Sequence, residues 1–234
     1  MAMIQLGFLA LTGLLALVLF LWASRIASIV YDAGKQRRFK IKTALLLVGW
    51  LAYISILSVA DVFTNATLPP RIPLLLILPA FAFFIYFFTN KQMRQIVAHT
   101  PPAWPVYFQC FRIIVELLLL GMFLDGQVPK AATFEGCNFD ILIGITAPVV
   151  AYFTYHKRAI NKKIALVWNF AGLLTLLVVV FILLSHAYFF SRYNEPQSML
   201  GKGLGTFPYI FLAGFFMPLA VFMHVFSIIK IRKG

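Results

Sequence analysis

Long apolar runs separated by short polar segments make up the whole chain. Seven runs, of 16 to 23 residues, are apolar enough to be helices in a bilayer, which takes about 20 residues to cross. We therefore predict an all-α membrane protein with seven transmembrane helices. No polar segment is long enough for a soluble domain, so residues 1–234 form a single domain. The predicted helices cover residues 4–23, 43–62, 72–89, 106–125, 140–155, 164–185 and 207–229.

The distribution of Lys and Arg predicts the orientation. Of the twenty Lys and Arg residues, fifteen fall on one side of the predicted helices and four on the other, and Arg112 lies within a helix. Basic loops stay in the cytoplasm, so we expect the N-terminus outside and the C-terminus cytoplasmic. The absence of a basic start before the first run is unlike a secretory signal peptide.

Composition agrees with this class and limits the partners. Hydrophobic residues make up 62% of the chain and charged residues 12%. The net charge of +13 lies in the cytoplasmic loops, so we expect membrane lipids with anionic headgroups as partners and no nucleic acid. Association into a homo-oligomer stays open.

The fourth predicted helix carries two ionisable groups, Arg112 and Glu116. Such groups are costly at membrane depth, so they are expected to face the protein interior and to have a function. Four positions apart, they share one helix face, about 6 Å apart along the axis. The alternative is an ion pair within the helix that only stabilises the bundle.

Other polar residues lie near this pair by depth along the predicted helices. Thr146, Asn169 and His224 are candidates for a substrate- or proton-binding site, although His224 also fits a plain hydrogen-bonded buried histidine. The outer mouth of such a site would hold Glu135, Asn138 and Asp140. Asp140 alternatively ends its helix in water as an N-cap.

Proline and glycine interrupt two of the predicted helices four residues apart. Pro148 and Pro218 each free the carbonyl four positions earlier, at Gly144 and Gly214. Interrupted helices are typical of binding sites in transporters, so these four residues are candidate hinges. Proline and glycine are also common in membrane helices in general.

No motif indicates a cofactor or a metal. The chain has no His-Glu-x-x-His, and its four His residues lie at different depths. No lysine lies in the middle of the last helix, which excludes a retinal Schiff base. We expect no cofactor, no metal site and no catalytic residues.

Two resemblances follow from particular residues. The run FRIIVELLLL, then TFEGCNFDILIGITAPVVAY, then Trp168-Asn169, Phe207-Pro208 and His224 resembles a family of bacterial inner-membrane proteins without an assigned activity. This resemblance implies a bacterial inner-membrane protein. The arrangement of three helices, one helix and three helices is similar to that of the SWEET sugar transporters in architecture only.

Three functional hypotheses remain. The first is a transporter or channel-like protein for a small polar or anionic solute, coupled to protons through Glu116 and Arg112. The second is a membrane enzyme acting on a lipid or isoprenoid at the outer interface through Glu135, Asp140 and His186. The third is a sensor or assembly subunit without turnover. The sequence favours a protein that is not an enzyme.

Overall fold

The computed structural model describes residues 2–195 and 197–233, and every regular element in this part of the chain is helical. The α-helices are α1 (Ala2–Val30), α2 (Ala33–Val59), α3 (Leu78–Thr89), α4 (Lys91–His99), α5 (Trp104–Phe108), α6 (Phe111–Leu124), α7 (Asp140–Ala151), α8 (Lys162–Tyr188) and α9 (Met217–Lys233). The shorter helical turns are η1 (Pro73–Ile77), η2 (Lys130–Ala132), η3 (Tyr152–His156), η4 (Phe190–Tyr193), η5 (Leu200–Leu204) and η6 (Leu212–Phe216).

Five helical segments are long and apolar enough to cross a membrane. They are Ala2–Val30, Ala33–Val59, Trp104–Leu124, Lys162–Tyr188 and Leu212–Arg232. A sixth, Pro73–Thr89, qualifies only together with α4, which bends away from it by 80°. Large apolar side chains on these helices are exposed, Leu45 by 67% and Phe181 by 67%. Such a surface is stable in lipid and not in water, so the chain is a helical membrane protein.

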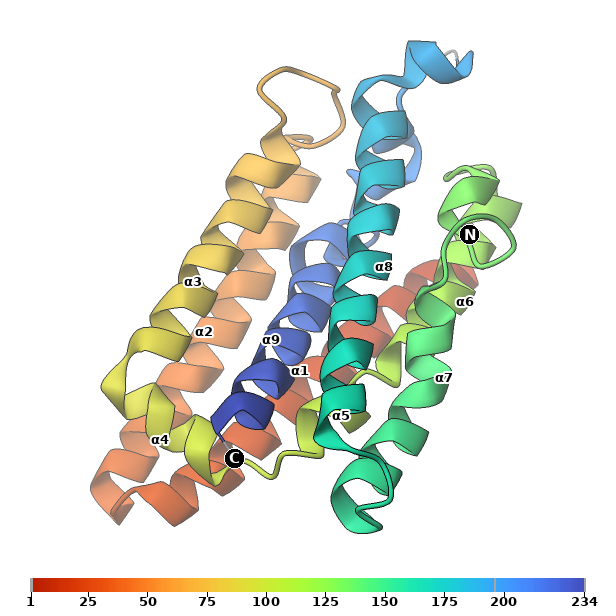
Figure 1. The fold of residues 1–234 in the computed structure, drawn as a ribbon. Coiled ribbons are helices and arrows are strands. Elements are labelled where there is room, and N and C mark those ends of the chain that lie inside the picture. Colours follow the sequence, from red (N-terminus) through yellow and green to blue (C-terminus); the bar gives the residue numbers. More distant parts are fainter. Residues whose placement is uncertain (1, 196, 234) are drawn as a thin grey trace.

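The last helix lies at the centre of the bundle (Figure 1). In the span that ends in α9, 67% of the most apolar window is buried, against 11% for α2 and 22% for α1. Helices α2 and α3 lie on one side of α9, and α6, α7 and α8 lie on the other (Figure 1). The N-terminus and the C-terminus lie at opposite ends of the bundle (Figure 1).

A tight turn at Tyr31–Asp32 joins α1 to α2. The carboxylate of Asp32 accepts the backbone N–H of Lys35 at 2.9 Å, which caps the first turn of α2. This backbone N–H, together with the charges of Lys35 and Arg38, lowers the pKa of Asp32 below its ordinary value. The turn thus begins the second helix without an intervening loop.

The segment between α6 and α7 has a buried side and an exposed side. Its residues Val128, Ala132, Thr133 and Asn138 are all at most 5% exposed. Irregular backbone at membrane depth is stable only when protein surrounds it, because its polar groups need partners there. The buried side of the segment therefore packs beside α6 and leads the chain to a helix start inside the protein.

Helix α7 begins deep in the bundle as a result. Its first residue, Asp140, contacts Arg112, which lies eight residues, roughly 12 Å, into the span that starts at Trp104. The prediction that Asp140 ends its helix in water as an N-cap is wrong, because Asp140 is 4% exposed and the side chain of Asn138 accepts its backbone N–H. The start inside the bundle also explains why α7 is short.

Candidate functional site

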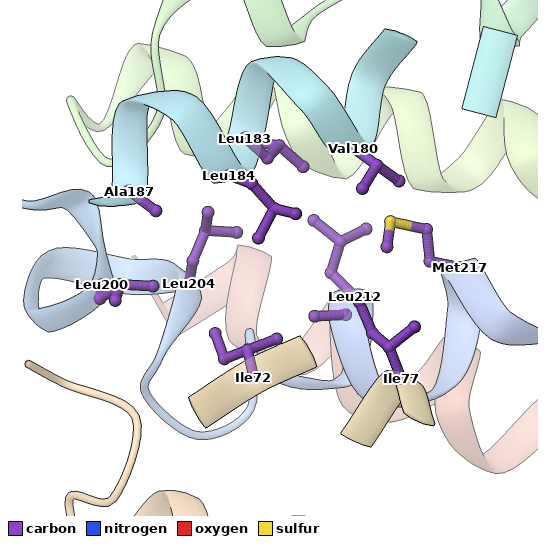
Figure 2. A pocket seen from close by; sticks show the side chains of 11 residues that line it. Ile72, Ile77, Val180, Leu183, Leu184, Ala187, Leu200, Leu204, Leu212 and Met217 are labelled. Atoms are coloured by element: carbon purple, nitrogen blue, oxygen red, sulfur yellow. The ribbon is translucent and has the colours of Figure 1, made fainter. Parts of the chain in front are cut away.

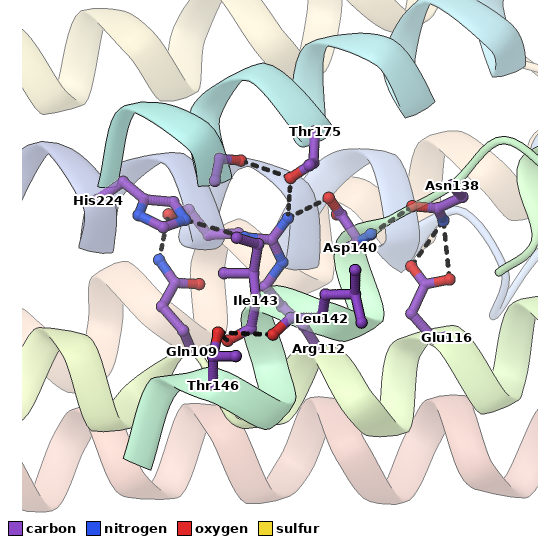
Figure 3. Close-up of polar contacts among 12 residues, drawn as sticks. Gln109, Arg112, Glu116, Asn138, Asp140, Leu142, Ile143, Thr146, Thr175 and His224 are labelled. Carbon is purple, nitrogen blue, oxygen red and sulfur yellow. Dashed lines mark hydrogen bonds and ion pairs between the residues drawn. The ribbon is translucent and has the colours of Figure 1, made fainter. Parts of the chain in front are cut away.

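Arg112 is the centre of a buried polar network between four helices (Figure 3). Its side chain is 3% exposed and forms an ion pair with Asp140 of α7. Its Nη2 also donates to Thr175 Oγ1 of α8 at 3.1 Å, and its Nη1 lies 2.9 Å from His224 Nε2 of α9. One guanidinium thus links α6 to α7, α8 and α9.

These contacts correct the expected partner of Arg112. One of the two alternatives from the sequence was an ion pair with Glu116, one turn along the same helix. The structure instead directs the guanidinium across the bundle to Asp140, and Glu116 contacts Asn138. Asp140 reaches Arg112 because α7 starts at its depth, which the spacing of residues along α6 could not reveal.

The contact with Arg112 determines the tautomer of His224. A guanidinium only donates hydrogen bonds, so His224 Nε2 must accept and must carry no proton. The ring proton then lies on Nδ1, which donates to Asn169 Oδ1 at 3.0 Å. The amide nitrogen of Asn169 in turn donates to Ser227 Oγ at 3.0 Å and to the carbonyl of Ala165 at 2.7 Å. His224 is therefore a neutral ring between a cation and an amide.

Two glycines allow this close approach of the helices. A Cβ on Gly172 of α8 would overlap the ring of His224, and Gly172 thereby provides the space that the ring occupies. A Cβ on Gly144 of α7 would lie 2.8 Å from Ile113 Cγ1 and 3.0 Å from Ile113 N. Small residues let membrane helices pack closely, and here they bring α7 and α9 to Arg112.

Asn138 connects the two buried carboxyl groups (Figure 3). Its amide nitrogen lies 2.7 Å from Glu116 Oε1 and 2.8 Å from Oε2, and it also donates to the carbonyl of Ala132 at 3.0 Å. Its carbonyl accepts the backbone N–H of Asp140 at 2.9 Å. Glu116 and Asn138 are each 1% exposed. One amide therefore fixes Glu116 and the start of α7 together.

A small void adjoins the ionisable groups. It has a volume of about 20 Å³ and is lined by Arg112, Glu116 and Asp140 and otherwise by apolar side chains of α6, α8, η6 and α9. The Nε of Arg112 is buried without a hydrogen-bond partner among the described residues. A water molecule fits such a volume when polar groups surround it. The void is thus a water-sized space lined by Arg112, Glu116 and Asp140.

A second void differs from the void at Arg112 in its lining. It has a volume of about 30 Å³ and lies between η1, α8 and η6 (Figure 2). Every residue that lines it is apolar, as Figure 2 shows with Leu183, Leu212 and Met217 among them. It therefore provides no group that could bind a polar solute.

The remaining predicted site residues lie around the network or outside it. Thr146 accepts a hydrogen bond from Trp168 Nε1 at 2.9 Å, and the Trp168 ring lies 5.5 Å from that of His224. Thr146 therefore approaches the network only through Trp168. Glu135 is exposed and lies 4.0 Å from Lys130, on the surface of the segment that buries Asn138.

Of the candidate hinges, Gly214 lies in an irregular turn of helix, whereas Gly144 and Pro148 lie within α7 and Pro218 lies within α9. The carbonyl of Gly214, four residues before Pro218, accepts a hydrogen bond from Trp50 Nε1 at 3.0 Å and lies in the π-helical turn η6. Pro148 is followed by the π-helical turn η3. Such turns often occur at functional sites. Movement about them stays a prediction.

The residues proposed for a lipid enzyme do not gather in one place. Asp140 faces Arg112, whereas the ring of His186 stacks on Tyr193 at 3.7 Å between centroids. Among the described residues, no three of the His, Cys, Asp and Glu side chains are grouped to hold a metal ion.

Two members of the network were not among the predicted site residues. Thr175 lies six positions after Asn169, and Ser227 lies three positions after His224. Ser227 is therefore on the helix face of His224, and this spacing is the signal that could have identified it, whereas Thr175 lies about 120° around α8 from Asn169.

The fold and the network define a polytopic helical membrane protein with a buried ionic site. The family model of a domain of unknown function, DUF8737, matches residues 69–232, and the chain belongs to this family. The match includes every residue of the network. No curated protein and no solved structure matches the sequence.

Proposed function

We propose that the protein is a transporter for a small polar or anionic solute that moves together with protons. In this proposal seven segments cross the inner membrane of a bacterium, with the N-terminus outside and the C-terminus in the cytoplasm. The distribution of Lys and Arg supports this orientation, and chain ends at opposite ends of the bundle agree with an odd number of crossings. In this proposal the partly buried segment 126–139 and α7 together make the fifth crossing.

The observation that carries the proposal is the arrangement of two carboxyl groups beside one guanidinium around a void. Glu116 and Asp140 both line the space next to Arg112, and His224 is neutral. An uncompensated charge in a membrane interior costs several kcal/mol. The two carboxyl groups therefore hold one proton between them at rest, which keeps the site neutral.

The need to keep the buried site neutral also couples the movement of the proton to that of the anion. Glu116, which carries that proton at rest, passes it to Asp140 and takes up a second one, and Arg112 thereby loses its carboxylate partner. An anionic group of the solute then pairs with Arg112 and restores the charge balance. Proton and anion thus enter together, because either one alone leaves a buried charge without a partner.

The surroundings add no competing titratable group to the void. The lining from α8, η6 and α9 is apolar, and no residue of α1 contributes to it. Lys130 of η2 is exposed and pairs with Glu135. Proton binding in this proposal therefore depends on Glu116 and Asp140, with Arg112 and His224 as the groups that face them.

The void of about 20 Å³ accepts nothing larger than water, so this conformation is closed in the proposed cycle. Opening requires α7 and η6 to move away from α6. Gly144 with Pro148, and Gly214 with Pro218, lie where such bending would occur. An interrupted helix that starts at a buried site is a common arrangement in transporters.

The test uses purified protein in proteoliposomes that contain a pH-sensitive dye. Inward gradients of succinate, phosphate and chloride are applied in turn, and proton entry is recorded. We expect one of these anions to drive proton entry, and Glu116→Gln to abolish it. Glu135→Gln, which removes an exposed carboxylate, is the matched control and retains the wild-type rate. Proton entry with none of the anions, or at an unchanged rate in Glu116→Gln, would contradict the proposal.

A further inference from the structure

A separate cavity lies at the end of the bundle that holds the C-terminus. It has a volume of about 320 Å³ and is formed where α4, η3, α8 and α9 meet, together with the segment after α4. Its lining comprises Arg94, Val97, Ala98, Pro102, Tyr155, Lys162, Lys230 and Ile231. This volume is within the range of small-molecule sites and far exceeds that of the void at Arg112.

The polar lining of this cavity is cationic. Arg94, Lys162 and Lys230 come from three different helices, and Tyr155 adds a hydroxyl group. No acidic residue lines the cavity among the described residues, and none of them forms an ion pair with these three cations. Three like charges around one space repel one another, so an anion that enters is bound by all three.

Local backbone adds to this preference for an anion. Lys162 is the first residue of α8, a helix of 27 residues whose N-terminus therefore lies at the cavity. The dipole at a helix N-terminus favours negative charge, although the side chain of Asn161 already accepts the backbone N–H of Lys163 at 2.9 Å. Lys230 is fixed in place because its Nζ donates to the carbonyl of Ala98 at 2.9 Å. The cavity thus combines a positioned ammonium, two exposed cations and a helix start.

The other side of the cavity is apolar. Val97, Pro102 and Ile231 line it, and Val97 is 4% exposed. A cavity whose lining is partly cationic and partly apolar suits a molecule with a phosphate at one end and carbon groups at the other. Basic cavities between membrane helices at the cytoplasmic side are suited to phospholipid headgroups.

We propose that this cavity is a binding site for a phosphate group, supplied by an anionic phospholipid headgroup or by a soluble phosphate. Arg94, Lys162 and Lys230 bind the phosphate oxygens, and Val97, Pro102 and Ile231 contact the carbon groups next to it. The site is distinct from the network at Arg112, and its existence does not depend on transport.

The main test compares two double variants of equal charge. Arg94→Gln/Lys162→Gln removes two cations from the cavity. Arg37→Gln/Lys163→Gln removes two exposed cations outside its lining, one of them next to Lys162 in the chain. Lys230 is left unchanged because its bond to Ala98 holds α9 to α4. Thermal unfolding confirms that both variants fold.

Binding is measured by native mass spectrometry of the delipidated protein with phosphatidylglycerol and with phosphatidylcholine. We expect phosphatidylglycerol to bind more tightly, and Arg94→Gln/Lys162→Gln to weaken it by roughly ten-fold or more, as the loss of two cations near an anionic lipid implies. The control should stay within about two-fold of the wild type, because each of its cations lies outside the cavity. Equal weakening in both variants would show general surface attraction and would overturn the site.

Inorganic phosphate, titrated by calorimetry, distinguishes the two sources. Phosphatidylglycerol that binds and is not displaced by millimolar phosphate identifies the lipid headgroup as the ligand. Phosphate that binds to the wild type and not to Arg94→Gln/Lys162→Gln, without tight lipid binding, identifies a soluble phosphate. Binding of neither probe would overturn the proposal.

Discussion

Arg112 of α6 and Asp140 of α7 form an ion pair in which both side chains are at most 6% exposed. The pair forms because α7 starts inside the bundle, after a partly buried irregular segment. In a buried pair the loss of one partner leaves the other charge without compensation, whereas the loss of both does not. This asymmetry gives the first prediction.

Arg112→Gln and Asp140→Asn should each destabilise the protein by about 3–5 kcal/mol, and the double variant by much less than the sum. Unfolding in mixed micelles, followed by circular dichroism, measures the free energies. Lys130→Gln and Glu135→Gln form the matched cycle on an exposed pair 4.0 Å apart, for which we expect almost no coupling. Additive effects in the buried cycle would show that the two charges do not compensate each other.

The second prediction concerns the proton on His224. Because Arg112 can only donate, Nε2 should be unprotonated and Nδ1 protonated. Nitrogen chemical shifts of labelled histidine distinguish these two states directly. Asn169→Leu removes the acceptor of the Nδ1 proton and should weaken the preference for this tautomer. A wild-type ring that carries its proton on Nε2 would be incompatible with the contact to Arg112.

The third prediction concerns the space provided by Gly172. Gly172→Ala places a methyl group into the His224 ring, so we expect a loss of about 1–3 kcal/mol from overpacking and a shifted His224 signal. Gly49→Ala is the control, since nothing lies within 4 Å of its Cβ position in α2. That variant should be neutral or more stable by up to about 1 kcal/mol, as alanine favours helix. Tolerance of Gly172→Ala equal to that of Gly49→Ala would mean that the ring is free to move.

The long apolar runs of the sequence predicted much of the fold. Five of the predicted runs correspond to helices long enough to cross a membrane, and Arg112 and Glu116 are buried, as ionisable groups in an apolar run should be. These features depend on local composition, which a sequence displays directly.

The partner of Arg112 could not be predicted in this way. The segment between α6 and α7 contains polar residues and two glycines and therefore has the composition of a surface loop. Its burial depends on Asn138, whose amide satisfies Glu116 and the first N–H of α7. Such pairing is a property of distant residues, and hydropathy along the chain carries no information on it. Thr175 and Ser227 were not predicted as site residues for a similar reason, since a single hydroxyl in an apolar helix often forms a hydrogen bond only to its own backbone.

The last prediction concerns Asp32 at the turn between α1 and α2. Its pKa is lowered by the backbone N–H of Lys35 and by nearby positive charge, so its carboxylate is favoured in the folded state. A carboxyl group with a lowered pKa stabilises the fold above its unfolded pKa, and this stabilisation disappears as the pH falls through the folded value. Asp32→Ala should therefore lower the unfolding midpoint at neutral pH, and the difference from the wild type should shrink below about pH 4. Asp32→Asn keeps an acceptor without a titrating group, so its difference from Asp32→Ala should not change with pH. Unfolding midpoints of the three proteins, measured from neutral pH to below about pH 4, test this prediction. A stability advantage of the wild type over Asp32→Ala that grows as the pH falls would contradict the role of the carboxylate as the cap of α2.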